Sequence, residues 1–158
     1  MSADPKALQP LVRSVSARDI IMAAAASRDW QPQHHDADHA RAVNLPGVIM
    51  NTPTQTGWFH AYALQCLGGM ARIGRWNLKM LRPVYPGLSV KLSGTVILRR
   101  PADHRGWEWL WLDLEMQADE AVLSTMRLLL ISPQPGADSQ MLDLDAEILW
   151  PPLDCHKR

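Results

Sequence analysis

Side chains that can titrate or bind a metal crowd into residues 27–40, where the sequence reads SRDWQPQHHDADHA. Six of them occupy the eleven positions from 29 to 39: Asp29, His34, His35, Asp36, Asp38 and His39. Carboxylates and imidazoles in such a cluster can bind a metal ion, activate a water molecule or cap a helix. The spacing of the residues distinguishes these three kinds of chemistry only in part.

A metal site is favoured by the spacing of His35 and His39, because residues four apart share one face of a helix and two aspartates stand nearby. Three features oppose it. Two of the three histidines in the stretch are adjacent, Pro32 predicts a loop at its start, and no distant cluster of Cys or Glu completes a ligand set. We therefore expect no metal.

Helix capping is the second interpretation of the cluster. Residues 37–43 have the composition of a short helix, and a carboxylate at its start, from Asp36 or Asp38, would accept hydrogen bonds from unpaired backbone N–H groups. The histidines would then lie in solvent. This interpretation leaves Asp29 and His34 unexplained.

Catalysis is the third interpretation, and it selects Asp29 and His34. They are five residues apart with Pro32 between them, so a folded loop can direct both side chains into one cavity. A carboxylate and an imidazole that share a water molecule can orient it and remove its proton near neutral pH. The spacing itself leaves capping and catalysis both open.

The elements that must position this loop follow from local patterns. Residues 11–16 alternate apolar and polar side chains, which predicts a short strand. Ser16 followed by Asp19 predicts the start of a helix, since each side chain can satisfy a backbone N–H of the first turn. Pro32 predicts that this helix ends near residues 27–30.

A longer helix follows the loop. Apolar residues recur at three- and four-residue spacing within TPTQTGWFHAYALQCLGG, so we expect a helix that Thr52 or Thr54 caps and that Gly68 ends. Long strand signals come next: ARIGRWNLKMLRPV, LSVKLSGTVILRR, WEWLWLDLEMQADE and AVLSTMRLLLIS. This order predicts an α+β fold in which an antiparallel sheet packs its concave side on the long helix.

Length and composition bound the function. At 158 residues we expect a single domain, residues 1–158, with a flexible or loosely docked tail from about residue 133. Lys plus Arg and Asp plus Glu number 16 each, so the net charge indicates neither nucleic acid nor membrane as a partner. No apolar run reaches the roughly 18 residues that span a bilayer. Cys66 and Cys155 form no disulfide framework, so a reducing cytoplasm is the expected location.

The cluster resembles the signature of the MaoC-like acyl dehydratases, which include the (R)-specific enoyl-CoA hydratases. That signature runs [S/T]-G-D-x-N-P-hydrophobic-H-x-D, with Ala four residues after the last Asp. Five positions of this sequence match it: Asp29, Pro32, His34, Asp36 and Ala40. Three positions depart, since Arg28 replaces Gly, Gln31 replaces Asn and Gln33 replaces the apolar residue before the His.

The resemblance extends from about residue 12 to residue 132. GVIMNTPTQTG stands where the family enters its central helix. LRPVYPGLSVKLSGTV resembles the family's P-V-x-x-G-D-x-L strand pair, with Leu88 in place of the Asp. The resemblance implies a hot-dog fold, in which the antiparallel sheet wraps around the long helix.

The resemblance also implies an activity, the reversible hydration of a trans-2-enoyl-CoA to a (3R)-hydroxyacyl-CoA without metal or organic cofactor. Asp29 and His34 would hold the water that adds at C3. A backbone N–H of Thr52, or of nearby Gly57, would stabilise the enolate oxygen. Gln31 and His60 are candidate substrate contacts, although His60 on the long helix also fits a packed histidine of the pocket wall.

Two other functions fit the same fold. A hot-dog thioesterase would attack the thioester carbonyl, and the D-x-x-P-x-H pattern speaks against it. An accessory subunit of a heteromeric dehydratase, such as those acting on steroid side chains, is the second, and the intact Asp29 and His34 argue against a purely passive role. We expect a homodimer or higher oligomer paired edge to edge, or a heteromer with a related hot-dog subunit. The sequence does not identify the acyl group of the substrate.

Overall fold

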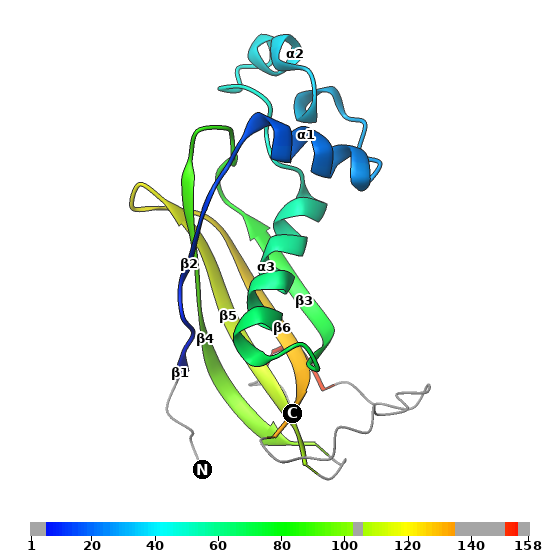
Figure 1. Ribbon diagram of the computed structural model, residues 1–158, viewed down its shortest axis with the longest axis vertical. Coiled ribbons are helices and arrows are strands. Elements are labelled where there is room, and N and C mark those ends of the chain that lie inside the picture. Colours follow the sequence, from blue (N-terminus) through cyan, green and yellow to red (C-terminus); the bar gives the residue numbers. More distant parts are fainter. Residues whose placement is uncertain (1–5, 103–105, 135–150, 155–158) are drawn as a thin grey trace.

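The computed structural model of the chain describes residues 6–102, 106–134 and 151–154 (Figure 1). The segment MLDLDAEILW and almost all of the tail predicted from about residue 133 lie outside the described residues. The described part is one antiparallel sheet, with the longest helix against its inner face and the shorter helices at one end of that helix (Figure 1).

The first helix, α1 (Ala17–Ala26), begins as predicted. The Ser16 hydroxyl accepts a hydrogen bond from the backbone N–H of Asp19 at 3.1 Å, and the Asp19 carboxylate accepts one from the Ser16 N–H at 3.2 Å. This reciprocal capping box satisfies two N–H groups of the first turn. Beyond the helix, the chain forms a single turn, η1 (Pro32–His34), and a short helix, α2 (Ala37–Ala42).

The long helix, α3 (Thr52–Leu67), is confirmed, but its predicted cap is wrong. The cap is Asn51, whose side-chain oxygen accepts from the N–H of Thr54 at 3.1 Å. Asn is among the strongest N-cap residues, whereas the predicted caps Thr52 and Thr54 already lie inside the helix. At the other end Gly68 takes a φ of 95°, a conformation in which a side chain would be strained, and this ends the helix as predicted.

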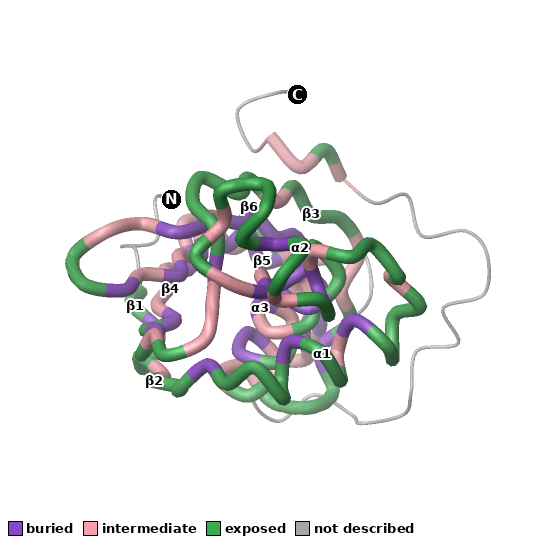
Figure 2. Tube along the Cα trace, turned by 90° about the horizontal axis from the view of Figure 1, so that it is seen from above, coloured by how far each residue is buried: buried purple, intermediate pink, exposed green. Residues whose placement is uncertain are grey.

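The sheet has the order β1-β4-β5-β6-β3, with β2 also paired to β4. Consecutive strands β4, β5 and β6 pair antiparallel as the predicted meander, and β3 pairs with β6 at the sheet edge. Seen from above, the sheet curls around α3 (Figure 2). The strands are β1 (Lys6–Ala7), β2 (Leu11–Ser14), β3 (Arg72–Met80), β4 (Ser89–Pro101), β5 (Trp107–Ala118) and β6 (Ala121–Pro133).

The two faces of the sheet differ because successive side chains on a strand point to opposite sides. Leu112 and Leu114 of β5 are buried in the core with Phe59 of α3. Trp111 points to the outer face, where it is also buried and its indole N–H donates to the carbonyl oxygen of Pro152 at 3.0 Å. None of the helices in the described ranges is long and apolar enough to cross a lipid bilayer.

Candidate active site

The turn after α1 positions Asp29. The N–H of Asp29 donates to the carbonyl of Ala24 at 2.9 Å, and the N–H of Arg28 donates to that of Ala25 at 3.0 Å. This pair of bonds is the Schellman pattern, which requires a left-handed residue in the position that Arg28 occupies with a φ of 54°. The left-handed conformation that this position requires explains the Gly of the resembled signature. Arg28 adopts the same conformation, which is strained for a residue with a side chain.

His34 is held by the turn η1. Its backbone N–H donates to the carbonyl of Gln31 at 3.0 Å, and its side chain is almost fully buried. The ring Nδ1 lies 2.7 Å from the carbonyl oxygen of Ile49. Because a carbonyl only accepts hydrogen bonds, Nδ1 carries the hydrogen, and the neutral ring then presents Nε2 as an acceptor.

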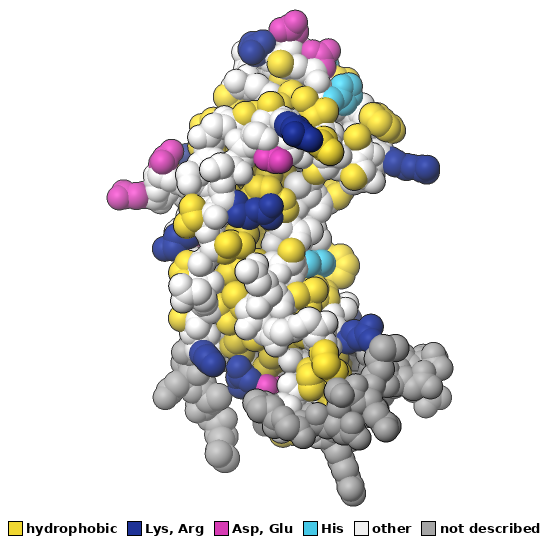
Figure 3. All heavy atoms as spheres, in the orientation of Figure 1, with side chains coloured by type: hydrophobic (Ala, Val, Ile, Leu, Met, Phe, Trp, Pro, Cys, Tyr) yellow, Lys and Arg dark blue, Asp and Glu magenta, His cyan; other side chains and the backbone are white. Residues whose placement is uncertain are grey.

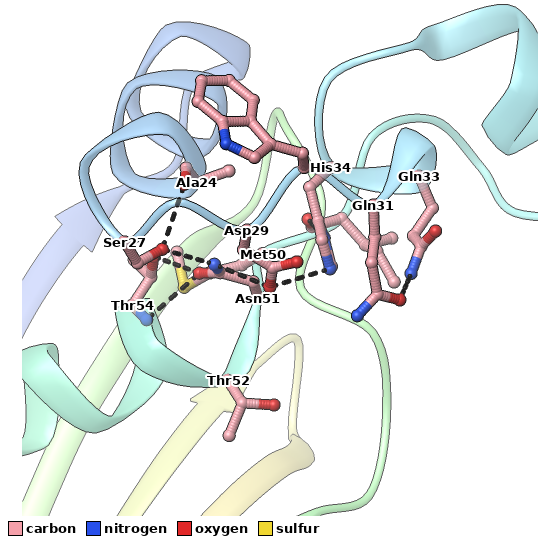
Figure 4. Close-up of polar contacts among 12 residues, drawn as sticks. Ala24, Ser27, Asp29, Gln31, Gln33, His34, Met50, Asn51, Thr52 and Thr54 are labelled. Atoms are coloured by element: carbon pink, nitrogen blue, oxygen red, sulfur yellow. Dashed lines mark hydrogen bonds and ion pairs between the residues drawn. The ribbon is translucent and has the colours of Figure 1, made fainter.

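Asp29 and His34 face one another (Figure 4). The distance between His34 Nε2 and Asp29 Oδ2 is 3.5 Å, and the two side chains are 8% and 18% exposed. This separation is longer than the about 2.7–3.2 Å of a good N–H···O bond. With Nδ1 protonated, two acceptor atoms converge on one small space, and a single water molecule can donate a hydrogen to each.

Asn51 braces the carboxylate from the other side. Its side-chain nitrogen donates to Asp29 Oδ2 at 3.0 Å and to the Ser27 hydroxyl at 2.8 Å, while its oxygen caps α3 (Figure 4). Asn51 is 2% exposed, so these bonds form away from solvent. One residue thereby fixes the start of the long helix and the orientation of Asp29 together.

A cavity of about 410 Å³ opens at this pair. Its wall comes from three parts of the chain: the loop after α1, the start of α3, and the end of β3 with the residues that follow it. The lining residues are Asp29, Gln31, Gln33, His34, Ile49, Met50, Asn51, Thr52, Gln55, Met80, Leu81, Arg82 and Pro83. A helix N-terminus on one wall provides unpaired backbone N–H groups and a favourable field for developing negative charge. The cavity thus combines the side chains of Asp29 and His34 with the N-terminus of a helix.

The two candidate oxyanion positions differ in the structure. Thr52 lines the cavity and is the first residue of α3, where backbone N–H groups have no acceptor within the helix. Gly57 lies in the second turn of α3, where N–H groups bond to the preceding turn, and it does not line the cavity. Thr52 is therefore the position that the geometry favours.

The two candidate substrate contacts differ in the same way. Gln31 lines the cavity, and its side-chain oxygen accepts from the Gln33 amide at 2.7 Å. His60 does not line it, and instead packs edge-on against Trp76 with ring centroids 4.8 Å apart. Burial lowers the pKa of His60. The structure thus places His60 as a packed histidine between α3 and β3.

Other members of the polar cluster have structural partners. Asp36 caps α2, as predicted for it or Asp38, by accepting from the N–H groups of Asp38 and His39 at 2.9 and 3.0 Å. These bonds, chiefly the one from His39, lower the pKa of Asp36. His35 Nε2 lies 3.2 Å from the carbonyl of Trp30. Within the described ranges, no group of three or more His, Cys, Asp and Glu side chains is placed to hold a metal ion.

Sequence patterns missed two residues of the site, Asn51 and Gln55. Both are 2% exposed and line the cavity from the first turns of α3. One signal in the sequence could have found them. Gln55 follows Asn51 by four residues, and this spacing puts both polar side chains on one helix face. A buried polar residue on such a face needs an explanation, either a hydrogen-bond partner or a ligand.

Comparison with known proteins identifies the family. The MaoC like domain family matches residues 3–101, a range that includes Asp29, His34 and Thr52. The beta subunit of the 3-oxo-4,17-pregnadiene-20-carboxyl-CoA hydratase of Mycobacterium tuberculosis is 35% identical over 77 residues. That match covers 49% of this chain and 60% of the relative's length.

Solved structures confirm the hot-dog fold. A chain in the ChsH1–ChsH2 complex from Mycobacterium tuberculosis is 26% identical with a TM-score of 0.73, and the match covers 85% of this chain and 100% of that one. The R-hydratase PhaJ1 from Pseudomonas aeruginosa is 18% identical with a TM-score of 0.67, covering 83% and 90%. At that identity the second likeness shows the fold alone. Since the family match takes in more than half of the residues, this chain belongs to the MaoC-like dehydratase family.

Proposed function

We propose that the chain catalyses the reversible hydration of a trans-2-enoyl-CoA thioester to the (3R)-hydroxyacyl-CoA. The observation that carries the proposal is the Asp29–His34 pair, in which Oδ2 and Nε2 stand 3.5 Å apart in one cavity while the Ile49 carbonyl fixes Nδ1 as the protonated nitrogen. Two converging acceptors suit a water molecule that must be oriented and deprotonated. Membership of the dehydratase family supports the same reaction.

In the hydration direction, the water oxygen forms a bond to C3 and gives one proton to the Asp29–His34 pair. The electron pair of the C2–C3 double bond moves through the conjugated system to the thioester oxygen, and an enolate forms. The backbone N–H of Thr52 at the start of α3 stabilises that oxygen, because a preorganised donor matches the charge that develops there. The proton then returns from the pair to C2, and the oxygen charge collapses to the carbonyl.

The same proposal includes a hot-dog partner along β3. This strand lies at the sheet edge, and the chain that leaves it forms the cavity wall at residues 80–83. Trp76, Met80 and Leu81 on this side are 48%, 52% and 58% exposed. Figure 3 shows hydrophobic side chains exposed on the face seen in this view, with Lys and Arg side chains scattered among them. A partner paired to β3 would cover these groups and border the cavity.

Two relatives support a related subunit as that partner. The relative from Mycobacterium tuberculosis is named a beta subunit, and the ChsH1–ChsH2 structure is a complex. The relative's name also supports a bulky acyl group on the CoA thioester. A homodimer is the alternative, and light scattering at micromolar concentration, with and without a co-expressed hot-dog partner, distinguishes the two.

The test is an enoyl-CoA panel that runs from crotonyl-CoA to longer and bulkier thioesters, each assayed with and without chelator. We expect loss of the conjugated enoyl absorbance without release of free thiol, and no effect of the chelator. Thiol release in step with absorbance loss would assign a thioesterase instead. Binding of the thioesters without any turnover, by the folded protein and by its complex, would assign an accessory subunit.

A further inference from the structure

Gln55 is a buried polar residue whose hydrogen bonding is incomplete. It is 2% exposed, and its side-chain oxygen Oε1 has no hydrogen-bond donor within the described part of the chain. Its nitrogen Nε2 reaches the Met50 carbonyl and the Met80 sulfur, each at 3.5 Å. The contact with the carbonyl is at the outer limit of an N–H···O bond, and a thioether sulfur is a weak acceptor, so the whole amide is poorly satisfied.

The neighbouring Asn51 shows that this part of the fold can satisfy an amide. Its nitrogen donates twice, and its oxygen accepts from the N–H and the hydroxyl of Thr54. Gln55 lies one turn further along the same face of α3, because residues four apart are neighbours on a helix surface. Of the four buried side-chain atoms without a partner in the described residues, Gln55 Oε1 is the one whose residue lines the cavity, so it is the one that a bound ligand can satisfy.

The position of Gln55 identifies the kind of ligand group. It lines the same cavity as Asp29 and His34, at the reacting end of the site. An acceptor such as Oε1 needs a donor, and the enoyl group carries no N–H or O–H at its reacting carbons. The hydroxyl at C3 of the hydrated product is the donor present there.

We infer that Gln55 is a positioning residue for the C3 hydroxyl, which donates a hydrogen bond to Oε1; this inference rests on the proposed hydration. The terminal torsion of a Gln side chain is broad, so the amide turns toward the ligand readily. The turn gives up only the two weak contacts of Nε2. Gln55 thereby distinguishes hydroxylated from unsubstituted acyl thioesters.

The test measures the affinity for two ligands that differ only in the hydroxyl, (3R)-hydroxybutyryl-CoA and butyryl-CoA, or the same pair on the chain that the panel selects. Titration calorimetry is done with Asp29→Asn protein, in which turnover is blocked. Adding Gln55→Met should lower the preference for the hydroxylated ligand by about 5-fold, the effect of one neutral hydrogen bond. The affinity for the unsubstituted thioester should stay constant.

Two further variants control this experiment. Gln65→Met makes the same change at an exposed position of α3 and should leave the preference unaltered. Gln55→Glu keeps an acceptor oxygen and should retain the preference, because Asp29→Asn has removed the neighbouring negative charge. Thermal melting of each variant should show an unchanged or higher midpoint for Gln55→Met, because that change removes an unsatisfied polar group.

The outcomes separate this inference from the proposed function. The inference is wrong if Gln55→Met keeps the full preference for the hydroxylated thioester. It is also wrong if Gln55→Glu loses that preference as Gln55→Met does. In both cases the proposed hydration by the wild-type protein is unaffected. A lower melting midpoint with an unaltered preference would assign Gln55 to packing. If the wild-type protein hydrates no thioester of the panel, the proposed function fails. If neither thioester binds, both proposals fail.

Discussion

Among the carboxylates that face a basic side chain, Asp113 and Asp29 differ most clearly in geometry. Asp113 on β5 lies opposite Arg127 on β6, and the guanidinium donates to both carboxylate oxygens at 2.7 Å. Asp29, on a loop, faces His34 Nε2 at 3.5 Å and accepts from the neutral amide of Asn51. The strand pair is a closed two-point contact, whereas the loop pair leaves space between its members.

The difference shows which features make a carboxylate available for chemistry. A planar guanidinium supplies donors to both oxygens of Asp113 and holds them in a fixed arrangement. Asp29 accepts a hydrogen bond from the Asn51 amide and faces the His34 imidazole. The other ring nitrogen of His34 is hydrogen-bonded to the Ile49 carbonyl. A water molecule can therefore bind at Asp29 and lose a proton, while Asp113 is occupied by its partner.

The largest effect should come from removing either member of the loop pair. Asp29→Asn and His34→Ala should each lower kcat for enoyl-CoA hydration by at least about 10²-fold, the usual contribution of an acid–base group. The double variant should lose much less than the product of the two, because residues that act as a unit are not additive. Near-normal turnover in either variant, or loss explained by unfolding in a thermal melt, would contradict the catalytic assignment.

A smaller effect should come from the brace on Asp29. Asn51→Ser keeps a good N-cap for α3 but is too short to donate to the carboxylate, so kcat should fall by about 10-fold with little change in KM. Ser27→Ala is the matched control, since it removes the other acceptor of the Asn51 amide and leaves the bond to Asp29. Equal losses of kcat in the two variants would show that the brace is unimportant.

The strand pair should respond differently to the same chemical change. Asp113→Asn should leave turnover unaltered and cost at most about 1 kcal/mol of unfolding free energy, because exposed ion pairs contribute little. The carboxylate and guanidinium side chains are 47% and 36% exposed, so solvent screens them. Urea unfolding and the hydration assay together check this prediction. A loss of activity comparable to that of Asp29→Asn would contradict the distinction between the strand pair and the loop pair.

The smallest effect concerns Asp36, the neighbour of the loop pair that only caps a helix. Hydrogen bonds from the backbone of His39 and Asp38 hold its folded pKa below the ordinary 3.8. Its stabilising contribution is therefore full above that pH and is lost as the pH falls through the lower folded pKa. Melting midpoints of wild type and Asp36→Ala should differ by a few degrees at pH 7 and converge in acid, with turnover retained at pH 7.

The sequence predicts the elements well where the signal is local. Ser16 and Asp19 specify a helix start within four residues, and the alternating side chains of β5 specify both faces of a strand. The pairing of β1 with β4 was not predicted, because two residues such as Lys6 and Ala7 carry no periodicity. Their partners, Val96 and Thr95, are distant in the chain.

The candidate site was predicted unevenly for the same reason. Asp29 and His34 stand in a recognisable motif, so their types and spacing single them out. The bond from Asn51 to Asp29 joins residues 22 apart, and it depends on how α1 packs beside α3. The unsatisfied oxygen of Gln55 is likewise a property of the packed structure, and no pattern of neighbouring residues reveals it.

The outer edge of β3, beside which no other strand of the described residues lies, bears on how much of the protein a cell can accumulate. Backbone groups along an open edge, beside an exposed Trp76, pair with any extended chain that they meet. If a hot-dog partner covers this edge, copies made in excess of that partner should aggregate or be degraded. In that case, the yield of soluble protein should follow the supply of the partner chain, and balanced synthesis of the two would set how much folded complex accumulates.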